Sequence, residues 1–373
     1  MTLWKQSLPH VKPYYAVKCN PEHWLLTWLA EGGAGFDCAS AREMSMVRES
    51  CALTKPDILF ANPCKKDWDI RKAAIAHVHT TVVDSTEEIE KLREFGWSGS
   101  SLVRIQVEDK GSAMPFSAKF GIEPECVPTM GRFAHLKGQT LRGVSFHVGS
   151  GCKEPQQYRL AIQQAVDCLK SLQEAGHEGA NLIDIGGGFM PDEFQEAASV
   201  IRETMKQYPQ FRFVAEPGRF MAAQSHDLFV RVIGKKPTKK RDGWRYTLDE
   251  SLYGQFSCIP FDHAKPKWLR VRAEGEPRRK STKAILYGRT CDSVDFLASA
   301  EETEELEVGD WLWYPHMGAY TTVTSTEFNG FPKPHTMVLA AHGKDQLPDP
   351  SEFAPTDWPK GVQYASAVKV PDV

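Results

Sequence analysis

The chain has 373 residues, of which 41% are hydrophobic and 25% charged, and its formal net charge is −3. This length predicts two domains, and this composition is that of a globular protein rather than a fibrous or disordered one. The nearly balanced charge gives no reason to expect a nucleic acid or an anionic membrane as a partner. No stretch reaches the roughly 18 apolar residues of a membrane helix, and residues 1–6 lack the apolar segment of a secretion signal.

The cysteine pattern favours a reducing compartment. The nine cysteines are odd in number and include no Cys-x-x-Cys pair, so reduced thiols in the cytoplasm are expected rather than a disulfide framework. His77 and His79 form the one histidine pair that suggests a metal ligand set. No third ligand is evident near them, so we expect no metal site.

Eight short apolar runs, each followed by a helical pattern, occupy the first part of the chain. They lie at residues 14–18, 35–39, 57–61, 80–84, 102–107, 144–148, 182–186 and 212–216. Most are rich in β-branched or aromatic residues and too short for helices. Eight strands alternating with helices within about 200 residues predict a β/α (TIM-type) barrel at residues 10–220.

The segments between these runs carry helix signals. Asn20-Pro21 predicts a helix start, and Trp24 and Trp28 are expected on the apolar face of that helix together with two leucines. Ser40 and Glu43 have the spacing of a capping box for the next helix. These signals support the alternation of strands and helices that a barrel needs.

The pattern changes after about residue 220. Strand-like runs at 228–233, 244–248, 283–287, 311–314 and 336–340 are separated by turn residues, and long helical faces are absent. This pattern predicts an all-β domain at residues 221–341, C-terminal to the barrel. Residues 342–373 are rich in Pro, Asp and Lys with little periodicity, so we expect a poorly ordered tail there.

Active residues of a barrel lie at the carboxyl ends of its strands. The predicted ends carry one lysine, three successive glycines, one arginine and two carboxylates: Lys18, Gly186, Gly187, Gly188, Arg219, Asp37 and Glu216. Successive glycines let backbone N–H groups approach a phosphate, although a glycine triplet alone is more often just a tight turn. A lysine that ends a buried strand either pairs with a carboxylate such as Asp37 or serves as a Schiff-base lysine. A phosphate turn, a reactive lysine and a carboxylate for a pyridine nitrogen together indicate pyridoxal 5'-phosphate.

A family resemblance rests on these same residues. Pro13-Tyr-Tyr-Ala-Val-Lys18-Cys-Asn20 resembles the cofactor-lysine motif of the ornithine decarboxylase family, in the alanine-racemase-like class (fold type III) of pyridoxal-phosphate enzymes. Further motifs follow in the family's order: Gly35-Phe-Asp-Cys-Ala-Ser40, Val144-Ser-Phe-His-Val-Gly-Ser-Gly-Cys152, Asp184-Ile-Gly-Gly-Gly-Phe189, Glu216-Pro-Gly-Arg219, Tyr253-Gly254, Phe261-Asp-His-Ala264, Thr290-Cys-Asp292 and Phe328-Asn-Gly-Phe331. The resemblance covers residues 10 to about 340.

The resemblance implies roles for residues of the barrel. Lys18 would hold the cofactor and later return a proton, and Asp37 would lie near Lys18 and tune it. Glu216 would pair with the pyridine nitrogen and keep it protonated, which makes the ring an electron sink. His147 would stack on the face of the ring. The phosphate would be held by Ser150, Gly186, Gly187, Gly188 and Arg219, together with Tyr320 of the predicted β domain.

It also implies roles for the β domain. Cys291 would protonate the carbanion after carbon dioxide leaves, and Asp262 and Asp292 would bind the distal ammonium of a basic amino acid. Phe328 is a further substrate-binding candidate. In the family, Cys291 and Asp292 reach the site from the other subunit of a head-to-tail homodimer. The implied reaction is decarboxylation of L-ornithine to putrescine in polyamine biosynthesis, in the cytoplasm.

Three departures from the family pattern leave alternatives open. The lysine motif comes so early that a first strand of the β domain is missing from the expected pattern. Pro115 stands where the family has an arginine close to the site, and the acidic degradation tail of some animal members is not evident. A decarboxylase of lysine, arginine or a modified amino acid is one alternative. A binding protein like the antizyme inhibitors is another, and an antizyme-like regulator would be a possible partner. Racemisation is not expected, because racemases of this class place arginine at the position of Glu216.

Overall fold

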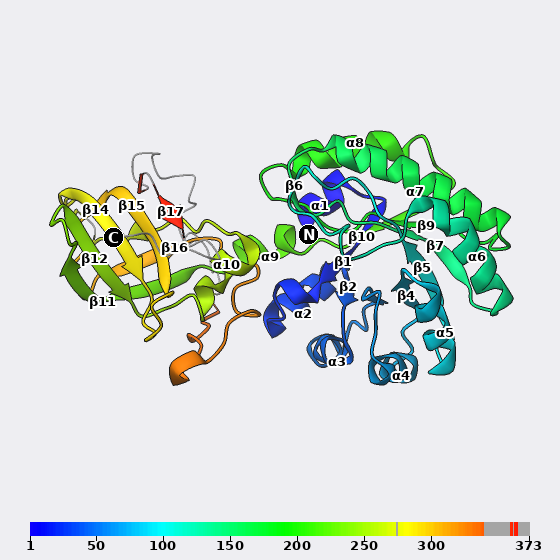
Figure 1. Cartoon of the computed structure of the whole chain (residues 1–373), viewed down its shortest axis with the longest axis horizontal. Coiled ribbons are helices and arrows are strands. Elements are labelled where there is room, and N and C mark those ends of the chain that lie inside the picture. Colours follow the sequence, from blue (N-terminus) through cyan, green and yellow to red (C-terminus); the bar gives the residue numbers. More distant parts are fainter. Residues whose placement is uncertain (274, 339–358, 361, 365–373) are drawn as a thin grey trace. The chain divides into compact units, whose positions relative to one another are not determined.

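The computed structural model of the chain describes residues 1–273, 275–338, 359–360 and 362–364. The chain folds into two compact units, Met1–Ala222 and Ala223–Val373 (Figure 1). The first unit carries the candidate cofactor residues except Tyr320, and the second carries Tyr320 and the candidate substrate residues.

Eight parallel strands of the first unit close into a barrel, which confirms the predicted β/α barrel. The strands are β1 (Val11–Ala16), β2 (Gly35–Cys38), β3 (Ile58–Phe60), β4 (Thr80–Val83), β5 (Ser100–Arg104), β7 (Leu141–Ser145), β9 (Leu182–Asp184) and β10 (Arg212–Ala215). They are hydrogen-bonded in the order β1-β10-β9-β7-β5-β4-β3-β2. A cluster of buried apolar residues that includes Leu59, Val82, Leu102, Leu182 and Val214 joins five of these strands. Packing of this kind fills the interior of a barrel, so the chemistry is left to the strand ends.

Helices surround these strands (Figure 1). They are α1 (Thr2–Ser7), α2 (His23–Glu31), α3 (Ala41–Ser50), α4 (Asp67–Ile75), α5 (Thr86–Glu94), α6 (Val127–Leu136), α7 (Gln156–Glu174), α8 (Phe194–Met205) and the short α9 (Arg219–Ala222). The turns η1 (Val17–Cys19), η2 (Pro124–Cys126) and η3 (Ala223–Ser225) and the strand pair β6 (Ser112–Met114) and β8 (Ser150–Cys152) complete the connections.

The local signals were partly right. Ser40 caps α3, since its Oγ accepts the N–H of Glu43, and the Glu43 carboxylate accepts the N–H of Ala39. The predicted start of α2 was wrong: Asn20 Oδ1 accepts the N–H of Glu22 at 3.0 Å, so the chain makes a turn and the helix begins at His23. The helix turns its leucines inward. Its tryptophans, predicted on that apolar face, are 51% and 53% exposed.

The predicted first strand also needs a correction that bears on the site. Strand β1 ends at Ala16, and Lys18 lies in the turn η1 just beyond it rather than at the end of the strand. The side chain of Lys18 is 51% exposed, so the cost of burying a bare ammonium does not arise. Lys18 still lies at the carboxyl end of β1, where barrel chemistry is expected.

The second unit is built on a seven-stranded sheet in the order β13-β16-β11-β12-β14-β15-β17. Its elements are β11 (Leu228–Pro237), β12 (Gly243–Leu248), η4 (Gln255–Ser257), α10 (Cys258–Asp262), β13 (Leu269–Arg270), β14 (Ser281–Tyr287), β15 (Phe296–Glu304), β16 (Trp311–Tyr314), η5 (Phe328–Gly330) and β17 (Gln363–Tyr364). Neighbouring strands are antiparallel except β12 and β14. The structure therefore agrees with the predicted β character of this part of the chain.

Some details of the second unit differ from the sequence predictions. The strand β15 was not predicted, and residues 336–338 form no strand, while 339–340 lie outside the described residues. Of the tail that was expected to be poorly ordered, 342–358, 361 and 365–373 lie outside the described residues. Gln363 and Tyr364 contradict that expectation, because they form β17 and pair with β15. Among the described residues, no helix combines the length and the apolar character needed to cross a membrane.

Candidate active site

Lys18 and Asp37 meet at the carboxyl ends of two adjacent strands. Strand β1 pairs with β2 in a register that sets Ala16 against Asp37. The Nζ of Lys18, two residues further on, forms an ion pair with Oδ2 of Asp37, whose side chain is buried. From the sequence alone, an ion pair with Asp37 and a role as the Schiff-base lysine were alternatives for Lys18. The geometry makes them compatible, because a buried carboxylate orients the ammonium group while half of the lysine side chain stays accessible.

His147 lies in the loop after β7 and presents an uncharged ring. Its Nδ1 accepts the N–H of Gly149 at 3.0 Å, which leaves the ring proton of a neutral imidazole on Nε2. Burial, followed by the positive charges of Arg104 and Lys18, lowers the pKa of His147 well below its ordinary value. A neutral, fixed, flat ring is suited to stacking on an aromatic cofactor.

The segment that contains Pro115 lies against this histidine. The ring of Phe116 meets the ring of His147 edge-on, with 4.9 Å between centroids. Asp109 fixes the segment, since its Oδ2 accepts the N–H groups of Phe116 and Ser117 at 2.6 and 2.8 Å. The departure at Pro115 is therefore next to a residue that touches the candidate site.

The three glycines after β9 form a turn that other residues cannot fill. A Cβ at Gly186 would lie 2.2 Å from the carbonyl oxygen of Phe146, and one at Gly187 would lie 2.8 Å from Nε2 of His147. Gly186 and Gly188 have φ values of 64° and 97°, which other residues rarely adopt. Within the described residues, the N–H groups of Gly187 and Gly188 donate to no acceptor. Two free N–H groups in a glycine turn can bind a phosphate.

Glu216 and Asp184 form a pair of buried carboxyl groups at the ends of β10 and β9. Asp184 Oδ1 accepts the N–H of Gly186 at 2.9 Å, whereas Asp184 Oδ2 and Glu216 Oε1 have no hydrogen-bond partner among the described residues. Burial, and then the charges of Asp184 and Asp37, raise the pKa of Glu216 well above its ordinary value. Burial also raises the pKa of Asp184. A buried carboxyl oxygen without a partner suggests that a donor from a ligand completes the site.

Two further phosphate candidates belong to the same unit. Ser150 opens β8, just beyond the His147 loop, and pairs in register with Met114 of β6. Arg219 is the first residue of α9, three residues after Glu216 in the chain. Both are partly exposed. Ser150 therefore lies close in the chain to His147, and Arg219 lies close in the chain to Glu216.

A second group of candidates lies in the loops of the β unit. The Tyr253 hydroxyl donates to Oδ2 of Asp292, and the ring of Tyr253 stacks on Phe328 with 4.2 Å between centroids. The N–H of Cys291 donates to the side-chain oxygen of Asn329 at 2.9 Å. These contacts bring together three of the predicted residues, Cys291, Asp292 and Phe328, and leave Cys291 exposed.

Asp295 holds the loop that carries Cys291 and Asp292. Its carboxylate is buried and accepts the N–H of Leu252 at 2.8 Å and both the N–H and the hydroxyl of Thr290, at 3.0 and 2.6 Å. The remaining two candidates are carried by other segments of the unit. Asp262 ends α10, and Tyr320 follows β16 with a left-handed backbone (φ 56°).

Sequence reasoning gave no role to four residues of these clusters: Arg104, Asp184, Tyr253 and Asp295. Asp184 and Tyr253 both begin motifs quoted for the family resemblance, so a signal existed. Arg104 was hidden because the predicted run 102–107 continued past the real end of β5. No local pattern pointed to Asp295, whose function in the loop depends on contacts between distant segments.

The fold and the first cluster define a class of protein: a barrel enzyme with a lysine, a neutral histidine, a buried carboxyl pair and an anion-binding glycine turn at its strand ends. The family model described as "Pyridoxal-dependent decarboxylase, pyridoxal binding domain" matches residues 1–223. The chain therefore belongs to the pyridoxal-dependent decarboxylases, carboxy-lyases that use pyridoxal phosphate.

Similar proteins cover most of the chain. An ornithine decarboxylase of Caenorhabditis elegans is 37% identical over 360 residues, which span 90% of this chain and 83% of the relative. An antizyme inhibitor 2 of Xenopus laevis is 36% identical over 364 residues, 92% of this chain and 79% of that one. The crystal structure of the arginine decarboxylase of Paramecium bursaria Chlorella virus matches with a TM-score of 0.83 at 32% identity, over 89% of this chain and 90% of that one.

The first unit fits this cofactor on two separate observations. The free N–H groups of Gly187 and Gly188 can receive the phosphate, and the unpartnered Oε1 of Glu216 can accept the N–H of a protonated pyridine. Lys18 supplies the amine needed to hold the cofactor covalently. When bound, the cofactor supplies an electron sink for the bond that breaks at the substrate's Cα.

Proposed function

We propose that this chain decarboxylates L-ornithine to putrescine, a reaction of polyamine biosynthesis, with Lys18 as the cofactor lysine. The observation that carries the cofactor part of the proposal is the buried, unpartnered Oε1 of Glu216, at a strand end adjacent to the glycine turn with free N–H groups. The substrate part is supported by the 37% identity to an ornithine decarboxylase. A cationic ring nitrogen that pairs with this buried carboxyl group would stabilise its ionised form.

The barrel residues divide the work of holding the cofactor and moving a proton. Asp37 orients the Lys18 amine and balances its charge, so that Lys18 can hold the cofactor and return a proton to the product. Glu216 keeps the pyridine nitrogen protonated, and neutral His147 covers the ring face. The phosphate is bound by Ser150, Gly186, Gly187, Gly188 and Arg219, and the β unit contributes Tyr320 to the same task.

The β unit supplies the substrate contacts in this proposal. The hydrogen bond from Tyr253, followed by that from the Val294 N–H, lowers the pKa of Asp292, so this carboxylate is ionised at neutral pH. An ionised carboxylate is what the distal ammonium of ornithine needs. Asp262 provides a second carboxylate, Phe328 packs against the aliphatic chain, and exposed Cys291 donates the proton to Cα.

We further propose a homodimer in which Cys291 and Asp292 of one subunit complete the site of the other, and a cytoplasmic location. Support for the first comes from the exposure of Cys291, whose loop is held by the hydrogen bonds from Thr290 to Asp295. Support for the second comes from the nine cysteines, all of which are free thiols in the structure.

The test is a carbon-dioxide-release assay with ornithine, lysine, arginine and diaminopimelate, reported as kcat/KM. We expect ornithine to be best, then lysine, then arginine, because one methylene is typically worth about 1–3 kcal/mol in discrimination. Asp292→Ala should reduce kcat/KM for ornithine strongly and Asp262→Ala less, whereas Glu301→Ala, which removes an exposed carboxylate of the same unit, should not. If ornithine is not among the better substrates, a decarboxylase of another amino acid replaces this assignment and the cofactor assignment stands.

A second candidate function is that of a catalytically weak binding protein, because one relative with 36% identity is an antizyme inhibitor. Against it, the chain retains Lys18, Asp37, Glu216, Arg219 and Cys291. The two functions differ in an absorbance band. A decarboxylase shows a cofactor band near the visible edge that borohydride removes, and a binding protein without cofactor shows none.

A further inference from the structure

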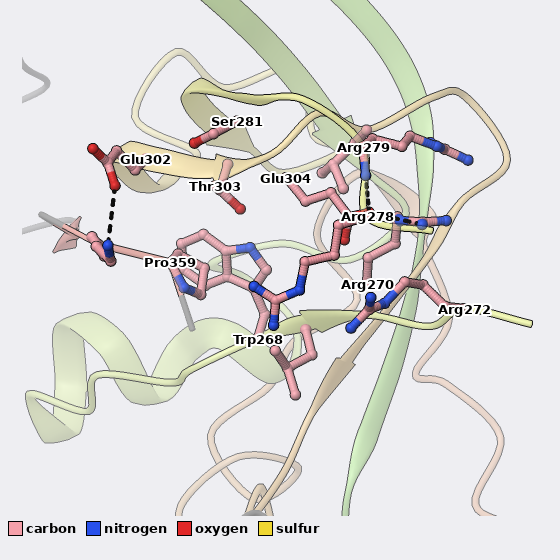
Figure 2. A pocket seen from close by; sticks show the side chains of 13 residues that line it. Trp268, Arg270, Arg272, Arg278, Arg279, Ser281, Glu302, Thr303, Glu304 and Pro359 are labelled. Atoms are coloured by element: carbon pink, nitrogen blue, oxygen red, sulfur yellow. Dashed lines mark hydrogen bonds and ion pairs between the residues drawn. The ribbon is translucent and has the colours of Figure 1, made fainter. Parts of the chain in front are cut away.

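A cavity of about 290 Å³ lies in the β unit and includes none of the residues proposed for catalysis (Figure 2). It is bordered by β13, β14, β15 and the segment at 359–360. Its lining is strongly basic. Five cations and two carboxylates face it: Arg270, Arg272, Arg278, Arg279, Lys360, Glu302 and Glu304.

The carboxylates of this cavity are already used. Glu304 Oε1 accepts hydrogen bonds from Arg270 Nη2 and from the N–H of Arg279, each at 2.8 Å. Glu302 forms an ion pair with Lys360 at 3.4 Å. Dashed lines in Figure 2 mark the contacts of Glu302 and of Glu304. Neither carboxylate therefore presents uncompensated negative charge to a ligand.

Carboxylates outside the lining hold two of the guanidinium groups in place. Glu276 accepts from Arg270 Nη1 at 2.8 Å, and Asp310 binds both Nη atoms of Arg279 at 2.6 and 3.2 Å. Arg272 forms no hydrogen bond or ion pair within the described part of the chain. Carboxylates therefore hold the guanidinium groups of Arg270 and Arg279 in place, and Arg272 is an additional, uncommitted cation on the lining.

Two buried N–H donors on the lining lack acceptors. Trp268 is 2% exposed, the side chain of Arg270 is also 2% exposed, and neither Nε1 of Trp268 nor Nε of Arg270 has a hydrogen-bond partner among the described residues. Figure 2 shows the side chain of Arg278 reaching across the cavity toward Trp268. Buried N–H groups are rarely left unpaired, so two on one basic cavity suggest a ligand that accepts from both.

We propose that this cavity binds a phosphate dianion, either inorganic phosphate or the phosphate group of a small ester. Its donors are Nε1 of Trp268 and Nε of Arg270, both at β13, and the guanidinium group of Arg272 just after that strand. Four oxygens in a tetrahedron can accept from donors that converge from several directions, whereas a planar carboxylate suits a single fork. The volume equals that of about ten liquid waters, enough for a phosphate with a short organic group.

The experiment is a calorimetric titration of the protein saturated with pyridoxal phosphate, so that the glycine turn of the barrel is already filled. Inorganic phosphate and glycerol 3-phosphate are the two probes, and acetate is the comparison anion. We expect saturable binding of a phosphate, one per chain, that Arg272→Ala and Trp268→Phe each weaken at least about tenfold. Lys239→Ala, which removes one exposed cation from the same unit, should leave it unchanged.

The probes separate the two sources of the phosphate group. Stronger binding of inorganic phosphate indicates the free ion, and stronger binding of glycerol 3-phosphate indicates an ester. The proposal is overturned if neither binds saturably, if acetate binds as tightly, or if Lys239→Ala weakens binding as much as Arg272→Ala. Because binding is measured without turnover, failure here is distinct from failure of the proposed decarboxylation.

Discussion

At the scale of single residues, the buried carboxyl groups of Asp184 and Glu216 determine the charge of the candidate cofactor site. Asp184 and Glu216 end adjacent strands of the barrel, and each has one oxygen without a partner among the described residues. Burial acts against their ionisation, and the pKa of each is raised. The nearby charges of Lys18, for Glu216, and of Arg104, for Asp184, lower these pKa values without offsetting burial, and a cationic ring nitrogen is the kind of group that stabilises the ionised pair further.

This pair predicts how the cofactor-free chain responds to pH. A carboxyl group whose pKa is higher in the folded state binds more protons when folded, so stability falls as pH rises between the unfolded and the folded pKa values. For Asp184 that interval runs from 3.8 to about 6. We predict that the free energy of unfolding, measured by urea denaturation, falls across this interval and falls less in Asp184→Asn.

The control for that measurement is Asp167→Asn, which changes an exposed carboxylate on α7. Its profile should follow that of the parent chain. Equal slopes in the parent and in Asp184→Asn would show that the buried pair does not titrate as described. Binding of the cofactor should flatten the profile of the parent, since the added cation stabilises ionised carboxylates.

The proposed role of Lys18 predicts that its removal abolishes the covalent attachment of the cofactor, which can be observed directly. Lys18→Ala should abolish covalent attachment of the cofactor and lower kcat by orders of magnitude, because the amine provides the covalent step. Lys12→Ala is a matched control, since it removes a lysine with an aspartate partner from the same segment, before the strand end. Absorbance and protein mass after borohydride reduction give the result. A cofactor still attached to Lys18→Ala would assign the role to another lysine.

At the scale of elements, the glycine turn after β9 is the most constrained connection of the barrel. Gly187→Ala should lower the affinity for the cofactor by roughly tenfold or more, about 1.4 kcal/mol, because its Cβ would lie 2.8 Å from both His147 Nε2 and the carbonyl oxygen of Glu216. Gly179→Ala has open space around its Cβ and serves as the control. Fluorescence titration of the cofactor-free variants measures the effect, and equal affinities would count against a close approach here.

Sequence patterns located the barrel strands because most are short, largely buried runs of apolar residues, many of them β-branched or aromatic, a signal that is local. Strand β15 gave no such signal, since Glu301 and Glu302 interrupt its apolar pattern and its pairing with β14 makes it a strand. Helical spacing placed Trp24 and Trp28 on one face correctly but could not tell that this face is exposed. Periodicity reports neighbours along an element, and tertiary packing decides which of them meet the core.

In the candidate site, too, local sequence signals were predictable and the effects of tertiary packing were not. Lys18, Asp37 and Glu216 could be named because each follows an apolar run and carries chemistry of its own. The raised pKa of Glu216 and the free N–H groups of the glycine turn could not be foreseen, since both result from burial and from segments far apart in the sequence. Asp295 was missed for that reason: its three hydrogen bonds go to Leu252 and Thr290, and no motif surrounds it.

At the scale of the whole molecule, the proposed reaction needs residues from both units, and the shared-site dimer makes a prediction that one chain alone cannot satisfy. Lys18→Ala and Cys291→Ala change different units, and each should be inactive by itself. If sites are built from two subunits, a mixed dimer contains one intact site and one doubly altered site. Random exchange of equal amounts should then restore about a quarter of the parent activity per chain, because half of the dimers are mixed and each has one of two sites intact.

Exchange is verified with differently tagged subunits, and mixing Lys18→Ala with Lys18→Ala is the control. Verified exchange without recovery would place Cys291 in the site of its own subunit and remove the reason for a shared-site dimer, while leaving the cofactor site of the barrel as described.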